Sequence, residues 1–414
     1  MNKYDVVVVG GGASGMMAAA TAASRGASVL LLEKNKRLGE KLRITGGGRC
    51  NVYNAEEDMR TLLKNYGKSE KFLYSAFTQF GMQESADYFN SRGLATKIED
   101  RKRAFPTTNK ALDVLRVLEQ DMTHSKVEVL TDVRVESIQT EQGSISSICT
   151  SKGDVHGHSY ILATGGTSRP DTGSTGDGFK WLRELGHTVD EPSPSITPLK
   201  LKDSWPASVA GKSAEVELSL CAGNKKKFKQ RGRLLFTHYG VSGPLVLNNA
   251  YRVAELLESS DVHVAINFYP ELDREDVDKK VVQALESNRA KMLKNVLKEL
   301  LPGGLSPIIT QIIGKQEIEA KNCSELSKVL RSKIVDVLCG ATAQVDSLMG
   351  FDKAVVADGG LALENLDTKT MRSKEITNLY VTGDLLNINR PSGGYSLQLC
   401  WTTGYIAGIN AARN

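Results

Sequence analysis

The chain has 414 residues, more than one ordinary hydrophobic core accommodates, so two or three domains are expected. Its 40% hydrophobic and 24% charged residues are typical of a water-soluble globular protein, and no apolar run approaches the ~20 residues of a membrane span. A net charge of +5 is too small to indicate a general nucleic-acid surface.

The cysteines and the start of the chain indicate a compartment. The six cysteines include no C-x-x-C pair, which argues against a dithiol reductase and a zinc site, so no metal is expected. A strand begins directly after Met1-Asn2-Lys3 and leaves no room for a signal peptide. These features predict a protein of the reducing cytoplasm.

The first structural unit begins with a short apolar run at residues 4–9 (YDVVVV), which suits a strand buried on both faces of a parallel sheet. Gly10, Gly12 and Gly15 follow with the spacing G-x-G-x-x-G. The first glycine allows a tight turn, the second lets a pyrophosphate approach the backbone, and the third lets helix and strand pack closely. The helix opened at residue 16 offers free N–H groups to phosphate.

A second apolar strand, residues 29–32, ends at Glu33, where a carboxylate can accept hydrogen bonds from ribose hydroxyls and disfavour a 2′-phosphate. The complete strand–turn–helix–strand–Glu pattern therefore predicts a dinucleotide-binding unit. A basic segment follows, and its consecutive glycines (Thr45 to Asn51, TGGGRCN) suit backbone that runs against a flat ligand.

The next elements alternate between helices and strands. Apolar spacing predicts helices over 59–92 and 109–124, and short strands at 127–130, 133–138, 145–150 and 160–163. The last strand ends in Ala163-Thr164-Gly165-Gly166, the second landmark of flavoproteins with two dinucleotide-binding folds, and a helix is expected to open after residue 178.

The middle of the chain differs in composition. Residues 191–194 (EPSP) and Pro198 predict a linker, followed by a β-rich unit with strands at 215–220, 233–237 and 262–268 and a turn at Gly223-Asn224. Residues 273–313 and 325–338 are expected to be helical. The chain then returns to the first domain with strands at 354–357 and 379–382 and a final helix over 396–412.

These elements predict an α/β fold: a Rossmann-like FAD-binding domain of the type with two dinucleotide-binding folds, carrying an inserted β-rich and helical region. The expected boundaries are 1–191 and 351–414 for the FAD-binding domain, 192–272 for a barrel-like β-rich domain and 273–350 for a helical segment.

Gly383-Asp384 follows a strand, where a carboxylate can accept hydrogen bonds from ribityl hydroxyls; a simple helix cap is the alternative. Gly393-Gly394 opens the final helix and would present N–H groups to the negative charge of a reduced flavin. Cys50 is either a redox thiol or, as the sequence favours, a packed one, because its motif holds no partner cysteine.

Two features lie within the inserted region. The basic cluster from Lys225 to Arg233 could hold RNA or an anionic substrate, although a solvated hairpin is the simpler interpretation. His238 and Tyr239, in FTHYGVSGP, are either a substrate-side acid–base pair or structural residues. No second G-x-G-x-x-G follows a strand, so a nicotinamide would have to visit the open flavin face transiently.

With these motifs the chain resembles the bacterial HI-type flavoproteins described as NAD(P)/FAD-dependent oxidoreductases, which include bile-acid 4,6-dehydro reductases and aminoacetone-oxidase-like proteins. The resemblance covers nearly the whole chain, and the GGGRCN and FTHYGVSGP segments are its most specific marks. The family pattern more often has Glu at position 384, acidic or glycine residues near 387–390 and Asn at 396, so a relative's substrate does not carry over to this chain.

The resemblance also implies the residues of the site. Val135 would contact the adenine through its backbone, and Tyr395 is a further candidate proton donor beside His238 and Tyr239. The residues expected to line FAD are Gly10, Gly12, Ala13, Ser14, Gly15, Glu33, Lys34, Lys41, Gly48, Arg49, Cys50, Asn51, Val135, Ala163, Thr164, Gly165, Gly383, Asp384, Gly393, Gly394 and Tyr395.

The sequence thus predicts an FAD-dependent oxidoreductase in which NADH or NADPH drives reduction of a conjugated or carbonyl-bearing small molecule by hydride transfer at flavin N5. The alternatives are a flavin-dependent RNA-modifying protein and an oxidase or redox module without nicotinamide. A small-molecule substrate is the expected partner, with no membrane and no nucleic acid. The oligomeric state does not follow from the sequence.

Overall fold

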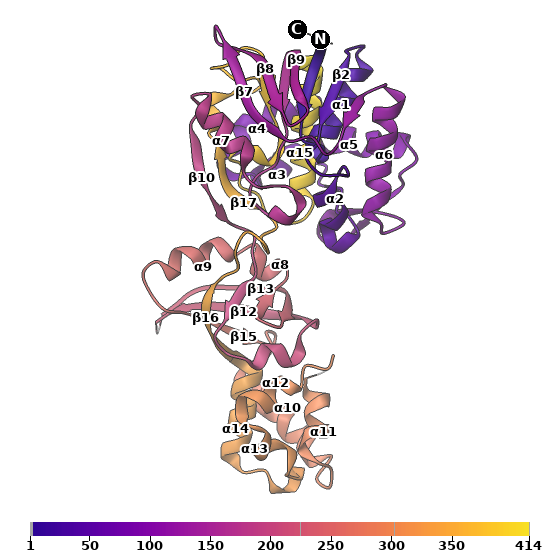
Figure 1. Cartoon of the computed structure of the whole chain (residues 1–414). Helices are drawn as coiled ribbons and strands as arrows, with labels where there is room; N and C mark the ends of the chain where they lie inside the picture. The colour runs from indigo at the N-terminus through magenta and orange to yellow at the C-terminus, as the bar shows by residue number, and fades with distance from the viewer. Residues whose placement is uncertain (1–2, 224, 302, 414) are drawn as a thin grey trace. The chain divides into compact units, whose positions relative to one another are not determined.

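The computed structural model describes residues 3–223, 225–301 and 303–413, which form two units. Unit 1 comprises Met1–Pro194 and Val355–Asn414, and unit 2 comprises the intervening Ser195–Ala354. Asn224, which the sequence places in a turn, lies outside the described residues. Each unit has its own hydrophobic core, and unit 2 is inserted into the chain of unit 1 (Figure 1).

Unit 1 is built on a seven-stranded sheet of β1 (Lys3–Val9), β2 (Val29–Leu32), β6 (Glu128–Leu130), β7 (Val135–Glu141), β8 (Ser144–Thr150), β9 (Gly153–Leu162) and β18 (Leu379–Val381). The strand order is β6-β2-β1-β9-β8-β7, and β18 also pairs with β9. β6, β2, β1, β9 and β18 run parallel, whereas β8 and β7 continue from β9 as antiparallel hairpins. Residues 6–9 and 29–32 are buried, as expected for parallel strands covered on both faces.

The first and last helices of unit 1, α1 (Ala13–Ser24) and α15 (Tyr395–Ala411), pack against each other, which joins the two ends of the chain (Figure 1). Glycines make this packing possible: a Cβ on Gly404 would lie 2.4 Å from the carbonyl oxygen of Ser14, and one on Gly408 would lie 2.5 Å from that of Ala18. The other helices of unit 1 are α2 (Glu40–Ile44), α3 (Met59–Lys64), α4 (Glu70–Gln79), α5 (Met82–Ser91), α6 (Ala111–His124) and α7 (Asp177–Glu184).

The helical region expected over 59–92 is interrupted. Helices α3, α4 and α5 are separate because the chain turns at Gly67 (φ +53°) and again at Phe80–Gly81. A small sheet follows in the order β3-β5-β4, formed by β3 (Tyr53–Asn54), β4 (Thr96–Glu99) and β5 (Arg103–Pro106). It brings residues 53–54 beside residues about fifty positions later in the chain.

The linker expected at residues 191–194 is wrong. These residues belong to β10 (Val189–Pro194), which pairs antiparallel with β17 (Ala357–Leu361). The register shifts between Asp190 and Ser193, so Pro192 has no partner in the ladder, and Pro194 is the last residue of the strand. The strand expected at 354–357 accordingly begins only at its last residue.

Unit 2 contains a closed barrel in the order β11-β14-β13-β12-β15-β16, and every neighbouring pair is antiparallel. Inward-facing apolar residues of these strands form the barrel core, for example Leu218, Phe236 and Val264. The strands are β11 (Leu199–Leu201), β12 (Ser213–Ala222), β13 (Lys225–Thr237), β14 (Gly240–Ser242), β15 (Val262–Asn267) and β16 (Ala341–Leu348).

The helices of unit 2 lie mostly between β15 and β16. They are α8 (Pro244–Leu247), α9 (Ala250–Leu257), α10 (Arg274–Glu286), α11 (Leu293–Leu300), α12 (Pro307–Ile313), α13 (Lys315–Glu319) and α14 (Lys328–Gly340). The expected helical segment, 273–350, therefore ends in a barrel strand. The alternation of small and apolar residues in β16 was too weak a signal to reveal that strand.

Candidate functional site

The three motif glycines of the β1–α1 turn have different surroundings. A Cβ on Gly10 (φ +106°) would lie 2.5 Å from the carbonyl oxygen of Ala163, and one on Gly15 would lie 1.9 Å from that of Gly10. Both glycines are therefore required by packing. A Cβ on Gly12 would meet no described atom within 4 Å, so this glycine faces open space where a phosphate can approach.

The beginning of α1 suits an anion. No side chain caps its N-terminus, and its first turn holds no acidic residue, so the N–H groups that follow Gly12 have no side-chain acceptor. Ser14, in this turn, lies against Gly383: a Cβ on Gly383 (φ +65°) would be 2.6 Å from the Ser14 hydroxyl. The first and last segments of unit 1 thus meet at this helix end.

Glu33 lies at the carboxyl end of β2 and is only 8% exposed. Its carboxylate accepts hydrogen bonds from the backbone N–H groups of Gly11 (2.7 Å) and Asn35 (2.8 Å). Burial raises the pKa of Glu33, and these backbone bonds oppose the rise. A carboxylate has about four acceptor positions, so two can still receive ribose hydroxyls. Glu33 is therefore also a structural residue of the turn, which the sequence did not reveal.

The Lys34 side chain and the Glu33 backbone connect the end of β2 to other segments of unit 1. The Lys34 ammonium donates to Thr175 (2.6 Å) and pairs with Asp177 (2.7 Å) at the start of α7, so its side chain joins two loops of unit 1. The backbone carbonyl of Glu33 accepts from Val133 N (3.0 Å), which brings the start of β7 and the buried Val135 close to the end of β2.

The Ala163–Thr167 turn leaves polar groups without a protein partner. The hydroxyls of Thr164 and Thr167 are buried and form no hydrogen bond with the described residues, although buried polar groups are normally paired. A Cβ on Gly165 (φ +74°) would lie 4.0 Å from the Lys41 ammonium, which donates to Ser168 (3.2 Å). Unpaired hydroxyls in a turn whose Gly165 lies near a lysine ammonium fit a phosphorylated ligand, so the residues present are compatible with FAD.

The glycine-rich segment adopts left-handed backbone conformations at Gly46 (φ +57°), Gly47 (φ +68°) and Gly48 (φ +85°). Added Cβ atoms on Gly47 and Gly48 would meet no described atom within 4 Å, so one side of this backbone is open. This is compatible with the flat ligand expected from the sequence.

Arg49 makes contacts within its own part of the chain. Its guanidinium donates to the side chains of Asn109 (2.6 Å) and Glu99 and lies 4.2 Å from the centroid of the Phe105 ring. Arg49 therefore attaches the glycine-rich segment to the small sheet β3-β5-β4, a structural role alongside the ligand contact expected from the sequence.

Cys50 is fully buried, and burial raises the pKa of its thiol to about 12. The thiol is therefore neutral at physiological pH, whereas redox and nucleophilic cysteines react as thiolates. Its positive φ (+60°) continues the left-handed backbone of the preceding glycines. The structure favours the packed cysteine over the redox thiol.

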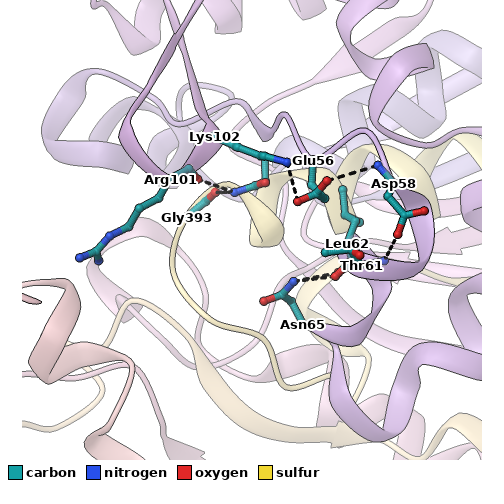
Figure 2. A network of polar contacts seen from close by, with 9 residues as sticks. Glu56, Asp58, Thr61, Leu62, Asn65, Arg101, Lys102 and Gly393 are labelled. Atoms are coloured by element: carbon teal, nitrogen blue, oxygen red, sulfur yellow. Dashed lines mark hydrogen bonds and ion pairs between the residues drawn. The ribbon is translucent and has the colours of Figure 1, made fainter. Parts of the chain in front are cut away.

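Two asparagines connect the glycine-rich segment to the start of α15. The side-chain amide of Asn54 donates to the carbonyls of Gly393 (3.0 Å) and Arg101 (3.1 Å). Figure 2 shows Arg101 and Gly393 within a polar network. With its amide nitrogen turned toward Tyr53 O, Asn51 accepts from Gly394 N (2.9 Å). The sequence identified Asn51 but not Asn54, because its partner lies 339 residues away.

Further polar contacts, drawn in Figure 2, connect residues near the start of α15. The Lys102 ammonium pairs with Glu56 (2.8 Å), and the Glu56 carboxylate accepts from the backbone N–H of Asp58 (3.3 Å). Asp58 in turn caps α3 by accepting from Thr61 N (2.8 Å). The hydroxyl of the buried Tyr66, just after α3, donates to the carbonyl oxygen of Tyr395 (2.9 Å). The start of α15 is thus held from two sides.

Arg390 contacts both Asp384 and Ser396, and all three residues lie where the sequence departs from the family pattern. The Arg390 guanidinium pairs with the Asp384 carboxylate and donates to the Ser396 hydroxyl (3.1 Å). The sequence did not predict Arg390 as a residue of the site. A charged residue in a glycine-rich stretch next to a candidate ligand carboxylate was the available signal.

His238 and Tyr239 form the two-residue turn between β13 and β14 in unit 2. His238 is exposed and Tyr239 is half-buried, with its carbonyl accepting from Leu201 N (2.9 Å). The residues expected to bind FAD lie in unit 1. A catalytic role of this pair stays a prediction.

The fold and these features define a class: a Rossmann-type flavoprotein oxidoreductase, whose expected ligand residues gather at the carboxyl ends of β1, β2, β9 and β18. Residues 4–410 match the HI0933-like protein Rossmann domain, so the chain belongs to the HI0933-like family. This confirms the predicted fold class and the predicted FAD-dependent oxidoreductase. Among the described helices, none is both long and apolar enough to cross a membrane.

Named relatives extend over the whole chain. A 3-dehydro-bile acid delta(4,6)-reductase from Clostridium scindens is 31% identical over 93% of both chains. A ribosomal RNA dihydrouridine synthase from Haemophilus influenzae is 28% identical over 94% of this chain and 93% of its own. The Rhodococcus jostii 3-ketosteroid-delta4-(5alpha)-dehydrogenase shares the fold at a TM-score of 0.57 and 16% identity, covering 100% of this chain and 97% of its own.

Proposed function

We propose that the protein reduces a carbon–carbon double bond conjugated to a carbonyl group in a small organic molecule, with electrons from NADH or NADPH. One observation carries the proposal: the two named relatives, each aligned over more than nine-tenths of the chain, reduce chemically similar bonds. A delta(4,6) 3-oxo steroid and uracil both present such a double bond. Reduction of this bond type is therefore the chemistry that their shared architecture supports.

The residues of unit 1 would hold FAD by its charged and polar parts. The turn at Gly12 and the start of α1 suit the pyrophosphate, Glu33 suits the adenosine ribose, and Asp384 suits the ribityl chain. When bound, FAD accepts a hydride from a reduced nicotinamide and delivers one to an electron-poor carbon. The open backbone at Gly47–Gly48 leaves room for the ring system.

Anaerobic absorbance spectroscopy of the purified yellow protein tests this function. NADH or NADPH should bleach the flavin band, and a 3-oxo-4,6-diene bile acid or 4-androstene-3,17-dione should restore it. Failure of both nicotinamides to bleach bound flavin would favour the oxidase or redox-module alternative. A protein that binds no FAD would contradict the proposal entirely.

An RNA substrate is the second candidate, favoured by the surface of β13 and by the dihydrouridine synthase relatives. Lys225, Lys226 and Lys227 are exposed, and none of the described residues forms an ion pair with them. By contrast, Lys229 and Arg231 are partly neutralised by Glu217. If RNA is the substrate, ribosomal RNA should be retained at low salt and released as salt rises, since phosphate contacts are salt-dependent.

One of His238→Ala and Tyr239→Phe is expected to slow substrate reduction at least about tenfold, because a positioned proton donor contributes ~10²–10⁴-fold. Bleaching of the flavin by nicotinamide should stay at the wild-type rate, since that half-reaction needs no such donor. Stopped-flow measurement of the two half-reactions separates these effects. If both variants reduced substrate at the wild-type rate, Tyr395 or water would be the donor and the pair would be structural.

A further inference from the structure

Arg390 is one of the few charged residues in the core of unit 1, at 2% exposure. Its guanidinium is held on three sides: Nη1 donates to the carbonyl of Ile388 (2.6 Å), Nε donates to the Ser396 hydroxyl (3.1 Å), and Nη2 pairs with Asp384. Ser396 lies in the first turn of α15. Arg390 therefore fixes a full positive charge beside the start of this helix.

The charges around Arg390 do not cancel. The pKa of Lys41 is lowered, mainly by burial and further by Arg390 and Arg169, while Asp384 opposes the shift. Geometry places Lys41 and Asp384 at the same turn: a Cβ on Gly165 would lie 4.0 Å from the Lys41 ammonium, and one on Gly166 would lie 3.8 Å from the Asp384 Cβ. Arg390 reaches this turn through its ion pair with Asp384. The first turn of α15 contains no acidic residue, and its N-cap residue, Gly394, has no side chain to cap it, so the positive end of the helix dipole adds to the cations.

We propose that Arg390 is a positioning residue that sets the reduction potential of the bound flavin. Its charge balances Asp384, so that Lys41 and the start of α15 leave net positive charge where reduced flavin carries negative charge. Without Arg390, the Asp384 carboxylate would offset the charge of Lys41 instead, and the reduced cofactor would lose the net positive charge that stabilises it. The inference rests on the proposed placement of FAD against the start of α15.

A purely structural role leads to a different expectation. Breaking a buried ion pair leaves an uncompensated charge and destabilises the fold, whichever partner is removed. If the role were purely structural, the reduction potential of bound flavin in the Arg390 and Asp384 variants would not depend on how many positive and negative charges each variant retains. The potential therefore distinguishes charge balance from structural support, whereas stability alone does not.

The test measures the midpoint potential of the FAD-loaded protein by anaerobic equilibration with a reference dye, at saturating FAD. In Arg390→Met the ratio of reduced to oxidised flavin at a given dye potential should fall about tenfold, which corresponds to ~30 mV for a two-electron couple. Arg390→Lys retains the charge, and Ser396→Ala removes only one hydrogen bond. Both should remain within about twofold of the wild-type ratio.

A double variant, Asp384→Asn with Arg390→Met, makes the test decisive. It removes one charge of each sign, so its potential should return to near the wild-type value although FAD binds more weakly. It also replaces the single variant as the test if Arg390→Met does not fold, with Asp384→Asn alone expected to raise the potential. Unchanged potential in Arg390→Met, or no return in the double variant, would overturn the inference. Absence of FAD from the wild-type protein would instead overturn the proposed function.

Discussion

A Gly12→Ala variant is expected to fold as stably as the wild type in the absence of FAD but to bind FAD at least about tenfold more weakly. The added methyl group would meet no described atom within 4 Å, and the backbone at Gly12 (φ −83°, ψ −171°) is extended, a conformation that any residue adopts. The same methyl group would stand where the pyrophosphate approaches. Urea unfolding of the apoprotein and fluorescence titration with FAD measure the two quantities.

Gly15→Ala is the matched control, three residues further along the same turn. Its methyl group would lie 1.9 Å from the Gly10 carbonyl oxygen, so α1 would have to move away from the sheet. We expect a loss of about 3 kcal/mol of apoprotein stability, the upper part of the range for overpacked interiors. If Gly12→Ala bound FAD as tightly as the wild type, the phosphate site would not be at this turn.

The nucleotide-binding half of the fold was predictable because its signals are local. The strand at residues 4–9, its glycine turn and the second strand ending at Glu33 lie within thirty residues, and each is specified by apolar runs or glycines. The errors occurred where pairing over long distances decides the structure. Residues 191–194 look like a linker until β17, more than 160 residues later, is available as a strand partner.

The same distinction applies to the site. The glycines of the site could be found from the sequence, because the site needs residues without a side chain at these positions. It did not find which side chains are engaged by the protein itself: Lys34 pairs with Asp177 and Arg49 with Glu99. It also missed Asn54 and Arg390, because the partner of Asn54 is brought close only by the packed fold and the importance of Arg390 follows from its burial.

Replacement of Glu33 should affect both the fold and the cofactor. In Glu33→Ala the buried N–H of Gly11 and the N–H of Asn35 lose their acceptor, and hydrogen bonds to charged groups contribute about 1.5–3 kcal/mol each. We expect the apoprotein to lose about 2–4 kcal/mol of unfolding free energy, since water can replace part of the Asn35 contact. The affinity for FAD should fall by a further 1–3 kcal/mol, about 5- to 150-fold, because the ribose hydroxyls lose their acceptor.

Glu33→Gln separates these two effects. Its amide oxygen can still accept from Gly11 N–H, but its NH₂ group cannot accept from Asn35 N–H, so apoprotein stability should lie between those of Glu33→Ala and the wild type. FAD affinity should also be intermediate, since a neutral amide is a weaker acceptor for ribose hydroxyls than a carboxylate. Titration with FAD under conditions where each variant is fully folded measures the binding effect free of the stability effect. Wild-type FAD affinity in folded Glu33→Ala would mean that Glu33 serves the turn alone and that the ribose is held elsewhere.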